Sequence, residues 1–82
     1  MRLSVYSLKK TLFDGEARSV NCKTAVGEIT ILDHHKPLIS ILVPGVAKIV
    51  DENNKEHFAN VQSGFLKGQT PNRVTLLVDE AA

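Results

Sequence analysis

Short runs in which apolar and polar residues alternate recur along this chain of 82 residues, and they constrain its fold more than any other feature. Successive side chains of a β-strand point to opposite faces, so this alternation is typical of strands with one buried face. No window repeats apolar residues at helical spacing over three turns. The pattern therefore predicts strands and no helix, with the clearest runs at Arg2–Leu8, Arg18–Cys22, Glu28–Leu32, Val46–Val50, His57–Val61, Phe65–Lys67 and Val74–Val78.

Residues that favour tight turns separate these runs. They are Asp14–Gly15, Val26–Gly27, Pro44–Gly45, Asn53–Asn54, Ser63–Gly64 and Pro71–Asn72. Each pair contains a residue that tolerates a positive φ or pre-sets a bend, and Asn53–Asn54 predicts the tip of a hairpin. A turn about every eight to twelve residues is typical of an all-β sandwich or barrel. We expect a single β-sandwich domain over residues 1–82, with about eight to ten short, mainly antiparallel strands.

The segment Leu38–Val43 differs from the other runs because it is apolar on both faces. This is typical of a strand that is covered on both sides, so we expect it to be buried. It is also the longest apolar stretch, and it is far too short to span a bilayer.

Composition excludes several classes of protein. Ten Lys and Arg against nine Asp and Glu give a formal charge of +1, which predicts neither nucleic-acid binding nor attraction to an acidic membrane. The single cysteine, Cys22, cannot form an internal disulfide, and the first residues lack the apolar core of a signal peptide. We expect a reduced, cytosolic, soluble domain that does not insert into the membrane.

The candidate catalytic and metal-binding residues are few. His34 and His35 are adjacent and, with Asp33 and His57, do not have the spacing of a known metal site, so no metal and no cofactor is predicted. Cys22 is expected to be an inert, half-buried thiol, and Glu28 a solvated residue at the start of a strand. No catalytic residue is assigned, and the chain looks like a rigid docking domain.

One stretch of the chain resembles a known family. Gly27–Leu38 reads G-E-I-T-I-L-D-H-H-K-P-L, and Leu32, His35, Pro37 and Leu38 match a loop of the type L-x-x-H-x-P-L. This loop is similar to that of the N-terminal β-sandwich of the epsilon subunit of F-type ATP synthases. Four further pieces match in the same order, so that the resemblance covers about residues 3–81: Phe13–Gly15, Pro44–Gly45, Ser63–Phe65 and Asn72–Asp79.

The resemblance implies a function that the residue patterns alone do not show. It implies a non-catalytic subunit of the central stalk of a proton-translocating rotary motor, peripheral to the cytoplasmic face of a bacterial membrane. Its expected partners are the gamma subunit and the membrane c-ring, and this chain alone is expected to bind no ATP. The implied c-ring surface is the turn Thr24, Ala25, Val26, Gly27 and Glu28, and the implied gamma surface is Ser7, His34, His35, Pro37, Leu38 and Ser40.

The chain departs from the family pattern in three places. Gln62–Ser63 stands where a second glycine is common, Thr70–Pro71 lengthens the last hairpin, and members usually continue into a C-terminal helical hairpin beyond the position of Ala82. The sequence leaves open whether such a hairpin was removed or is naturally absent. Two other functions also stay open: a free-standing sandwich that binds a small molecule or one protein, and a small hydrolase that uses Glu28 or His35.

Overall fold

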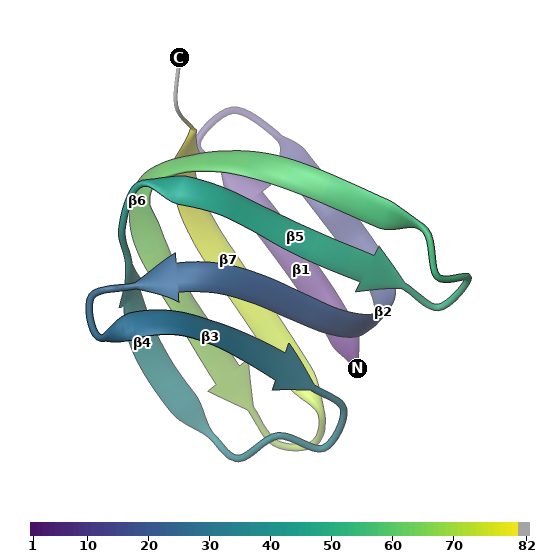
Figure 1. The fold of residues 1–82 in the computed structure, drawn as a ribbon. Helices are drawn as coiled ribbons and strands as arrows, with labels where there is room; N and C mark the ends of the chain where they lie inside the picture. Colours follow the sequence, from purple (N-terminus) through teal and green to yellow (C-terminus); the bar gives the residue numbers. More distant parts are fainter. Residues whose placement is uncertain (81–82) are drawn as a thin grey trace.

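The computed structural model describes residues 1–80, and within that range it contains β-strands and no helix (Figure 1). Within the same residues, therefore, no helix is available that could cross a membrane. The all-β prediction is confirmed, and the number of strands is close to the expected one. The strands are β1 (Arg2–Ser7), β2 (Thr11–Thr24), β3 (Gly27–Leu32), β4 (Leu38–Leu42), β5 (Gly45–Asp51), β6 (Glu56–Gln69) and β7 (Arg73–Glu80).

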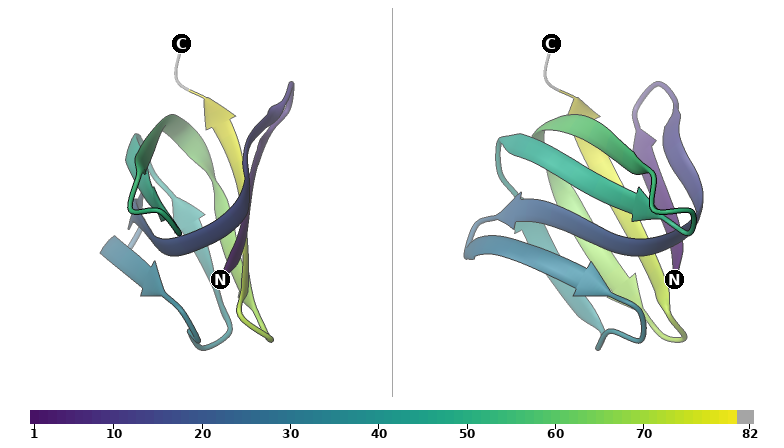
Figure 2. Two further views of the ribbon diagram at one scale, coloured as in Figure 1. Left: turned by 90° about the vertical axis from the view of Figure 1, so that its right-hand side faces the viewer. Right: turned by 45° about the vertical axis from the view of Figure 1, so that its right-hand side comes forward.

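The strands form one hydrogen-bonded sheet that folds over into two layers, which Figure 2 shows from the side. The order is β1-β7-β6-β4-β2-β3, and β5 lies between β2 and β6. Only β1 and β7 pair in parallel; the other pairs are antiparallel. One layer contains the first half of β2, β1, β7, the second half of β6 and β4. The other contains β3, the second half of β2, β5 and the first half of β6.

The two longest strands correct the prediction of turns at Asp14–Gly15 and Ser63–Gly64. Both pairs lie inside strands, β2 and β6, each of which has 14 residues and passes from one layer to the other. The pairing of β6 with β7 shifts between Val61 and Ser63, so the expected bend is a bulge within a continuous strand. Gly64 has a φ of 146°, and a Cβ there would lie 2.1 Å from the carbonyl oxygen of Leu77, so only glycine fits this position.

The predicted hairpin tip at Asn53–Asn54 is confirmed between β5 and β6. Asn54 has a φ of 63°, which asparagine tolerates better than most residues. The carboxylate of Asp51 accepts hydrogen bonds from the backbone N–H groups of Asn53 (2.8 Å) and Lys55 (3.0 Å). This Asx-type turn explains why the polar segment connects two strands tightly.

The core lies between the two layers and consists mainly of aliphatic side chains that alternate along the strands. Its largest fully buried members include Leu3 of β1, Ile49 of β5, Leu66 of β6 and Leu76 of β7. Each such side chain stabilises the fold by about 1.5–3 kcal/mol through the apolar area that it removes from water. Cys22 is 2% exposed, so it is buried more completely than the sequence analysis expected.

Candidate protein-docking site

The structure corrects the prediction that Leu38–Val43 is covered on both sides. In β4, Leu42 points into the core and is 2% exposed, whereas Ile39 and Ile41 are 73% and 66% exposed. The strand lies in an outer layer, so only one of its faces meets the core. Its other apolar face is therefore on the surface of the molecule.

Ile41 belongs to a line of apolar side chains that crosses four neighbouring strands of the layer. It pairs with Phe65 of β6, Phe65 pairs with Leu77 of β7, and Leu77 pairs with Tyr6 of β1. Residues directly opposite each other in neighbouring strands point to the same face, so the four side chains stand side by side. With about 4.8 Å between strands, this apolar row of Ile41, Phe65, Leu77 and Tyr6 extends over about 14 Å.

Polar residues border the apolar row on both sides along the strands. On one side Ser63 pairs with Asp79, and on the other Lys67 pairs with Thr75. An apolar centre with a polar margin is the usual composition of a surface that binds another protein.

Each end of the apolar row meets a shallow hollow beside a hairpin. Beyond Ile41, a hollow of about 230 Å³ lies between the β2–β3 turn and β4, and Val26 in that turn is 91% exposed. Beyond Tyr6, a hollow of about 250 Å³ lies between β7 and the β1–β2 turn, where Leu8 is 94% exposed. The exposed Val26 and Leu8 continue the row at its two ends. The hollow beside each of them gives a side chain of a partner a place to lie.

The β2–β3 turn, which the sequence analysis assigned to the c-ring, is held firmly against β4. The buried hydroxyl of Thr24 donates to the carbonyl oxygen of Gly27 (2.6 Å) and accepts from the N–H of Val26 (3.3 Å). The N–H of Ala25 donates to the carbonyl oxygen of Ile41 at 3.0 Å. The remaining residues of the turn are exposed, and Glu28 is solvated at the start of β3, as expected.

The loop between β3 and β4 carries the two adjacent histidines, and it places them differently. His34 is exposed with a φ of 61°, and its N–H donates to the side-chain oxygen of Asn72 at 2.7 Å. His35 is half-buried over Gly68 of β6, where a Cβ would lie 3.1 Å from the imidazole ring. The small size of Gly68 therefore makes room for the ring, and Nε2 of His35 is buried without a hydrogen-bond partner among residues 1–80.

The other residues assigned to gamma lie along β1 and β4. Leu38 and Ser40 are half-buried, and Ser40 pairs with the buried Leu66, so both lie on the inner face of β4. Ser7 ends β1, and its hydroxyl accepts hydrogen bonds from the N–H groups of Lys9 and Lys10 in the turn that follows. The β3–β4 loop, which contains the exposed Pro37, and the end of β1, which is formed by Ser7, lie at opposite ends of the molecule (Figure 1).

Sequence reasoning missed the side chains of the apolar row. The two apolar faces of Leu38–Val43 were visible in the sequence, and a strand with two apolar faces needs a cover on each of them. Among residues 1–80 no further layer covers this face. The assignment from the sequence named Leu38 and Ser40 instead of their outward-facing neighbours Ile39 and Ile41.

Two kinds of chemistry, a nucleophilic thiol and a metal site, can be compared with the described residues. Burial raises the pKa of the Cys22 thiol to about 11, so the thiol is protonated at neutral pH. No three His, Cys, Asp or Glu side chains among residues 1–80 come close enough to hold a metal ion. The features that the structure does bring together are the apolar row and its two hollows.

The fold and this surface together are typical of a small β-sandwich domain that binds another protein. The family model described as "ATP synthase, Delta/Epsilon chain, beta-sandwich domain" matches residues 1–82. The chain belongs to this family.

Two curated relatives support the same assignment. The ATP synthase epsilon chain of Clostridium perfringens (strain SM101 / Type A) is 39% identical over 80 residues, which are 98% of this chain and 59% of the relative. The ATP synthase epsilon chain of Alkalilimnicola ehrlichii is 34% identical over 82 residues, which are 100% of this chain and 58% of that relative. The chain thus spans less than two thirds of the length of these relatives.

Solved structures share the fold. A chain in a cryo-EM structure of Euglena gracilis mitochondrial ATP synthase, comprising OSCP, F1 and c-ring, matches 100% of this chain and 52% of its own length with a TM-score of 0.90 and 20% identity. A chain in the central stalk and c-ring of Tetrahymena thermophila mitochondrial ATP synthase matches 98% of this chain and 63% of its own length, with a TM-score of 0.81 and 19% identity. At this identity the two neighbours show the β-sandwich fold of the family.

Proposed function

We propose that this chain is the non-catalytic central-stalk domain of a proton-translocating F-type ATP synthase, and that it joins the gamma subunit to the membrane c-ring. In this role it transmits rotation between the ring and the catalytic head. It sits on the cytoplasmic face of a bacterial membrane as a peripheral part of the complex. The chain supplies stiffness and binding surfaces, and the chemistry of ATP synthesis takes place elsewhere.

The observation that carries the proposal is the apolar row on the outer face of β1, β7, β6 and β4. A soluble domain seldom leaves such a continuous apolar surface uncovered, because water contact with it is unfavourable. We assign this face to gamma, with the β3–β4 loop and the end of β1 at its margin. Of the previously assigned residues, Ser7, His34, His35 and Pro37 belong to that margin, whereas Leu38 and Ser40 lie on the inner face of β4 and support it from beneath.

The β2–β3 turn, from Thr24 to Glu28, is assigned to the c-ring. Hydrogen bonds of Thr24 within the turn and the bond from the N–H of Ala25 to Ile41 of β4 keep it rigid. The exposed carboxylate of Glu28 is available to polar or basic groups of ring loops. The turn borders one end of the apolar row, so contacts with gamma and with the ring would adjoin each other. A rigid sandwich between two adjoining contacts transmits torque with little deformation, since its strands are cross-linked and its core is close-packed.

Binding of the purified chain to its two expected partners tests the proposal. We expect the 82-residue chain to bind purified gamma in calorimetry and to be retained by gamma assembled with the c-ring. ATP should give no binding heat at micromolar concentrations. Failure to bind gamma or the ring would favour the free-standing binding module, and hydrolytic activity that Glu28→Gln or His35→Ala abolishes would favour an enzyme.

A further inference from the structure

A third hollow, larger than the two at the ends of the apolar row, lies where β4 begins and β6 ends. Its volume is about 570 Å³, against about 230 and 250 Å³ for the other two. Ile39 pairs with Lys67 beside this hollow, and both side chains stand on the outer face, one step along the strands from Ile41 and Phe65. The hollow therefore continues the surface that carries the apolar row. Its walls contain Pro37, Leu38 and Ile39 of one segment and Lys67, Gln69 and Thr70 of the other.

The lining of this hollow combines apolar carbon with hydrogen-bond donors. Lys67 contributes an ammonium group, Gln69 an amide and Thr70 a hydroxyl, whereas Pro37 and Ile39 contribute exposed apolar surface. Among residues 1–80 the hollow has no acidic residue in its lining. A carboxylate accepts hydrogen bonds from such donors, and the aliphatic stem that carries it packs on the apolar wall. The composition therefore fits an acidic side chain.

The cations around the hollow are not neutralised by the described part of the chain. Lys36 lies in the loop before β4, and Arg73 of β7 stands opposite Gln69 on the outer face. Within residues 1–80, no carboxylate oxygen lies within 4.0 Å of the charged nitrogens of Lys36, Lys67 or Arg73. Their positive charges are thus available to a partner.

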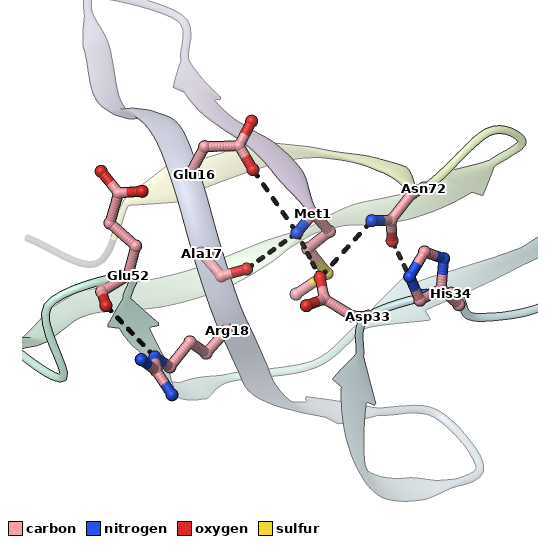
Figure 3. Close-up of polar contacts among 8 residues, drawn as sticks. All are labelled: Met1, Glu16, Ala17, Arg18, Asp33, His34, Glu52 and Asn72. Atoms are coloured by element: carbon pink, nitrogen blue, oxygen red, sulfur yellow. Dashed lines mark hydrogen bonds and ion pairs between the residues drawn. The ribbon is translucent and has the colours of Figure 1, made fainter.

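The acidic residues at this end of the layer face other groups. The carboxylate of Asp14 on β2 pairs with Arg2 at 2.8 Å. Glu16 of β2 and Asp33 of the β3–β4 loop both approach the backbone nitrogen of Met1, as Figure 3 shows. A carboxylate that enters the hollow from outside therefore meets donors that these acids leave available.

We propose that gamma places an acidic side chain, Asp or Glu, in this hollow, where its carboxylate pairs with Lys67. This contact rests on the proposed function, which assigns the outer face to gamma, and it names the chemistry that gamma presents there. The apolar wall excludes part of the surrounding water from the pair, and an ion pair is stronger where the effective dielectric constant is lower. The apolar row supplies contact area, and the pair fixes how gamma is oriented on it.

The opposite margin of the apolar row carries the opposite charge. Asp79 stands there, four residues along β7 from Thr75, which is the partner of Lys67. At about 3.3 Å per residue, Asp79 and Lys67 are about 13 Å apart along the strands, so they do not neutralise each other. A gamma surface turned end for end would bring its carboxylate against Asp79, and like charges at an interface repel. The two margins thus favour one of the two orientations in which the row can be covered.

Replacement of Lys67 tests the pair by calorimetry with purified gamma. We expect Lys67→Gln to weaken binding about fivefold and Lys67→Glu about thirtyfold at low salt, because the first loses an attraction and the second adds a repulsion. In about 1 M salt the loss for Lys67→Glu should shrink, since screening reduces the range of charge interactions to about 3 Å. The matched control is Lys55→Glu, the same charge change at the exposed hairpin tip between β5 and β6, which should change affinity less than about twofold.

Carbodiimide cross-linking of the complex identifies the partner group directly. The reagent joins an amine and a carboxyl group that touch as an amide, and it leaves as a urea that carries the displaced oxygen. We expect peptide mapping to find Lys67 joined to an Asp or Glu of gamma. Cross-links only through other lysines, together with an unchanged affinity of Lys67→Glu, would overturn the acidic contact.

Two further outcomes separate this contact from the proposed function. Weaker gamma binding of Phe65→Ala but not of Lys67→Glu would refute the acidic contact and leave the proposed function standing, whereas no binding of the unmodified chain to gamma would refute both. Sedimentation with phosphatidylglycerol vesicles that depends on Lys67 would overturn the proposal in favour of a lipid headgroup. We expect no such sedimentation, because the hollow adjoins an apolar row that fits a protein surface.

Discussion

Truncation of Phe65 tests whether the apolar row binds gamma. Phe65 occupies the middle of the row, between Ile41 and Leu77, and 47% of it is exposed. A phenylalanine can bury about 200 Å², so about 90 Å² remains for a partner to cover. At about 25 cal/mol per Å², Phe65→Ala should weaken gamma binding by about 2 kcal/mol, or about 30-fold in Kd.

Phe58→Ala provides the matched control. Phe58 lies on the same strand but on the outer face of the other layer, opposite Lys48, and it is 64% exposed. If exposed aromatic area alone drove association, this variant would lose more affinity than Phe65→Ala. We expect it to bind gamma as the unmodified chain does, because its face is not assigned to gamma.

Isothermal titration calorimetry of each variant with purified gamma measures the effect. Thermal melting followed by circular dichroism must accompany it, since about half of Phe65 is covered by neighbouring residues and its loss will lower stability. Titrations are therefore made well below the melting temperature of the least stable variant. An affinity of Phe65→Ala within twofold of the unmodified chain, or an equal loss for Phe58→Ala, would refute the assignment of the row to gamma.

Three further predictions concern the turn, the bulge and the acidic groups. Glu28→Lys should weaken coupling of proton pumping in an assembled complex, and normal pumping would contradict the c-ring assignment. The same change should alter the free energy of unfolding of the domain by less than about 0.5 kcal/mol, because Glu28 is exposed. Gly64→Ala should destabilise the fold by at least about 2 kcal/mol in urea titration, because its Cβ would collide with the Leu77 carbonyl at a positive φ; an unchanged midpoint would contradict the bulge geometry. The hydrogen bond from His57, 2.9 Å away, and that from Lys55 lower the pKa of Asp51 in the folded state. The contribution of Asp51 to stability is therefore present above its unfolded pKa of about 3.9, and it is lost as the pH falls through the folded pKa. Asp51→Asn should therefore make melting less dependent on pH below about pH 4, and an unaltered acid dependence would argue against the pair.

The predictions from the sequence succeeded where the information is local. Alternation identified part of every strand except β4, because side-chain direction along a strand depends only on its period of two. The hairpin tip at Asn53–Asn54 followed from the turn chemistry of asparagine and of the preceding Asp51. The five ordered motifs, among them the loop from Leu32 to Leu38, identified the family, which the family model and the curated relatives confirm.

The predictions failed where the outcome depends on residues distant in the sequence. Glycine at positions 15 and 64 tolerates a tight turn and a bent strand equally well, and pairing with β1, β4 and β7 selects the strand. The sequence pattern likewise could not show that the side chain of Asn72 meets the backbone of His34, because this contact joins residues 38 positions apart.

The sequence by itself determined that Leu38–Leu42 is a strand with two apolar faces, since composition and period are properties of the segment alone. Only the tertiary structure decided which face is covered. The position of β4 beside β6 in an outer layer turns Leu42 inward and leaves Ile39 and Ile41 in contact with water. Burial is a property of the whole packing arrangement, so a strand pattern can show that a face requires a cover but not whether that cover comes from the same chain.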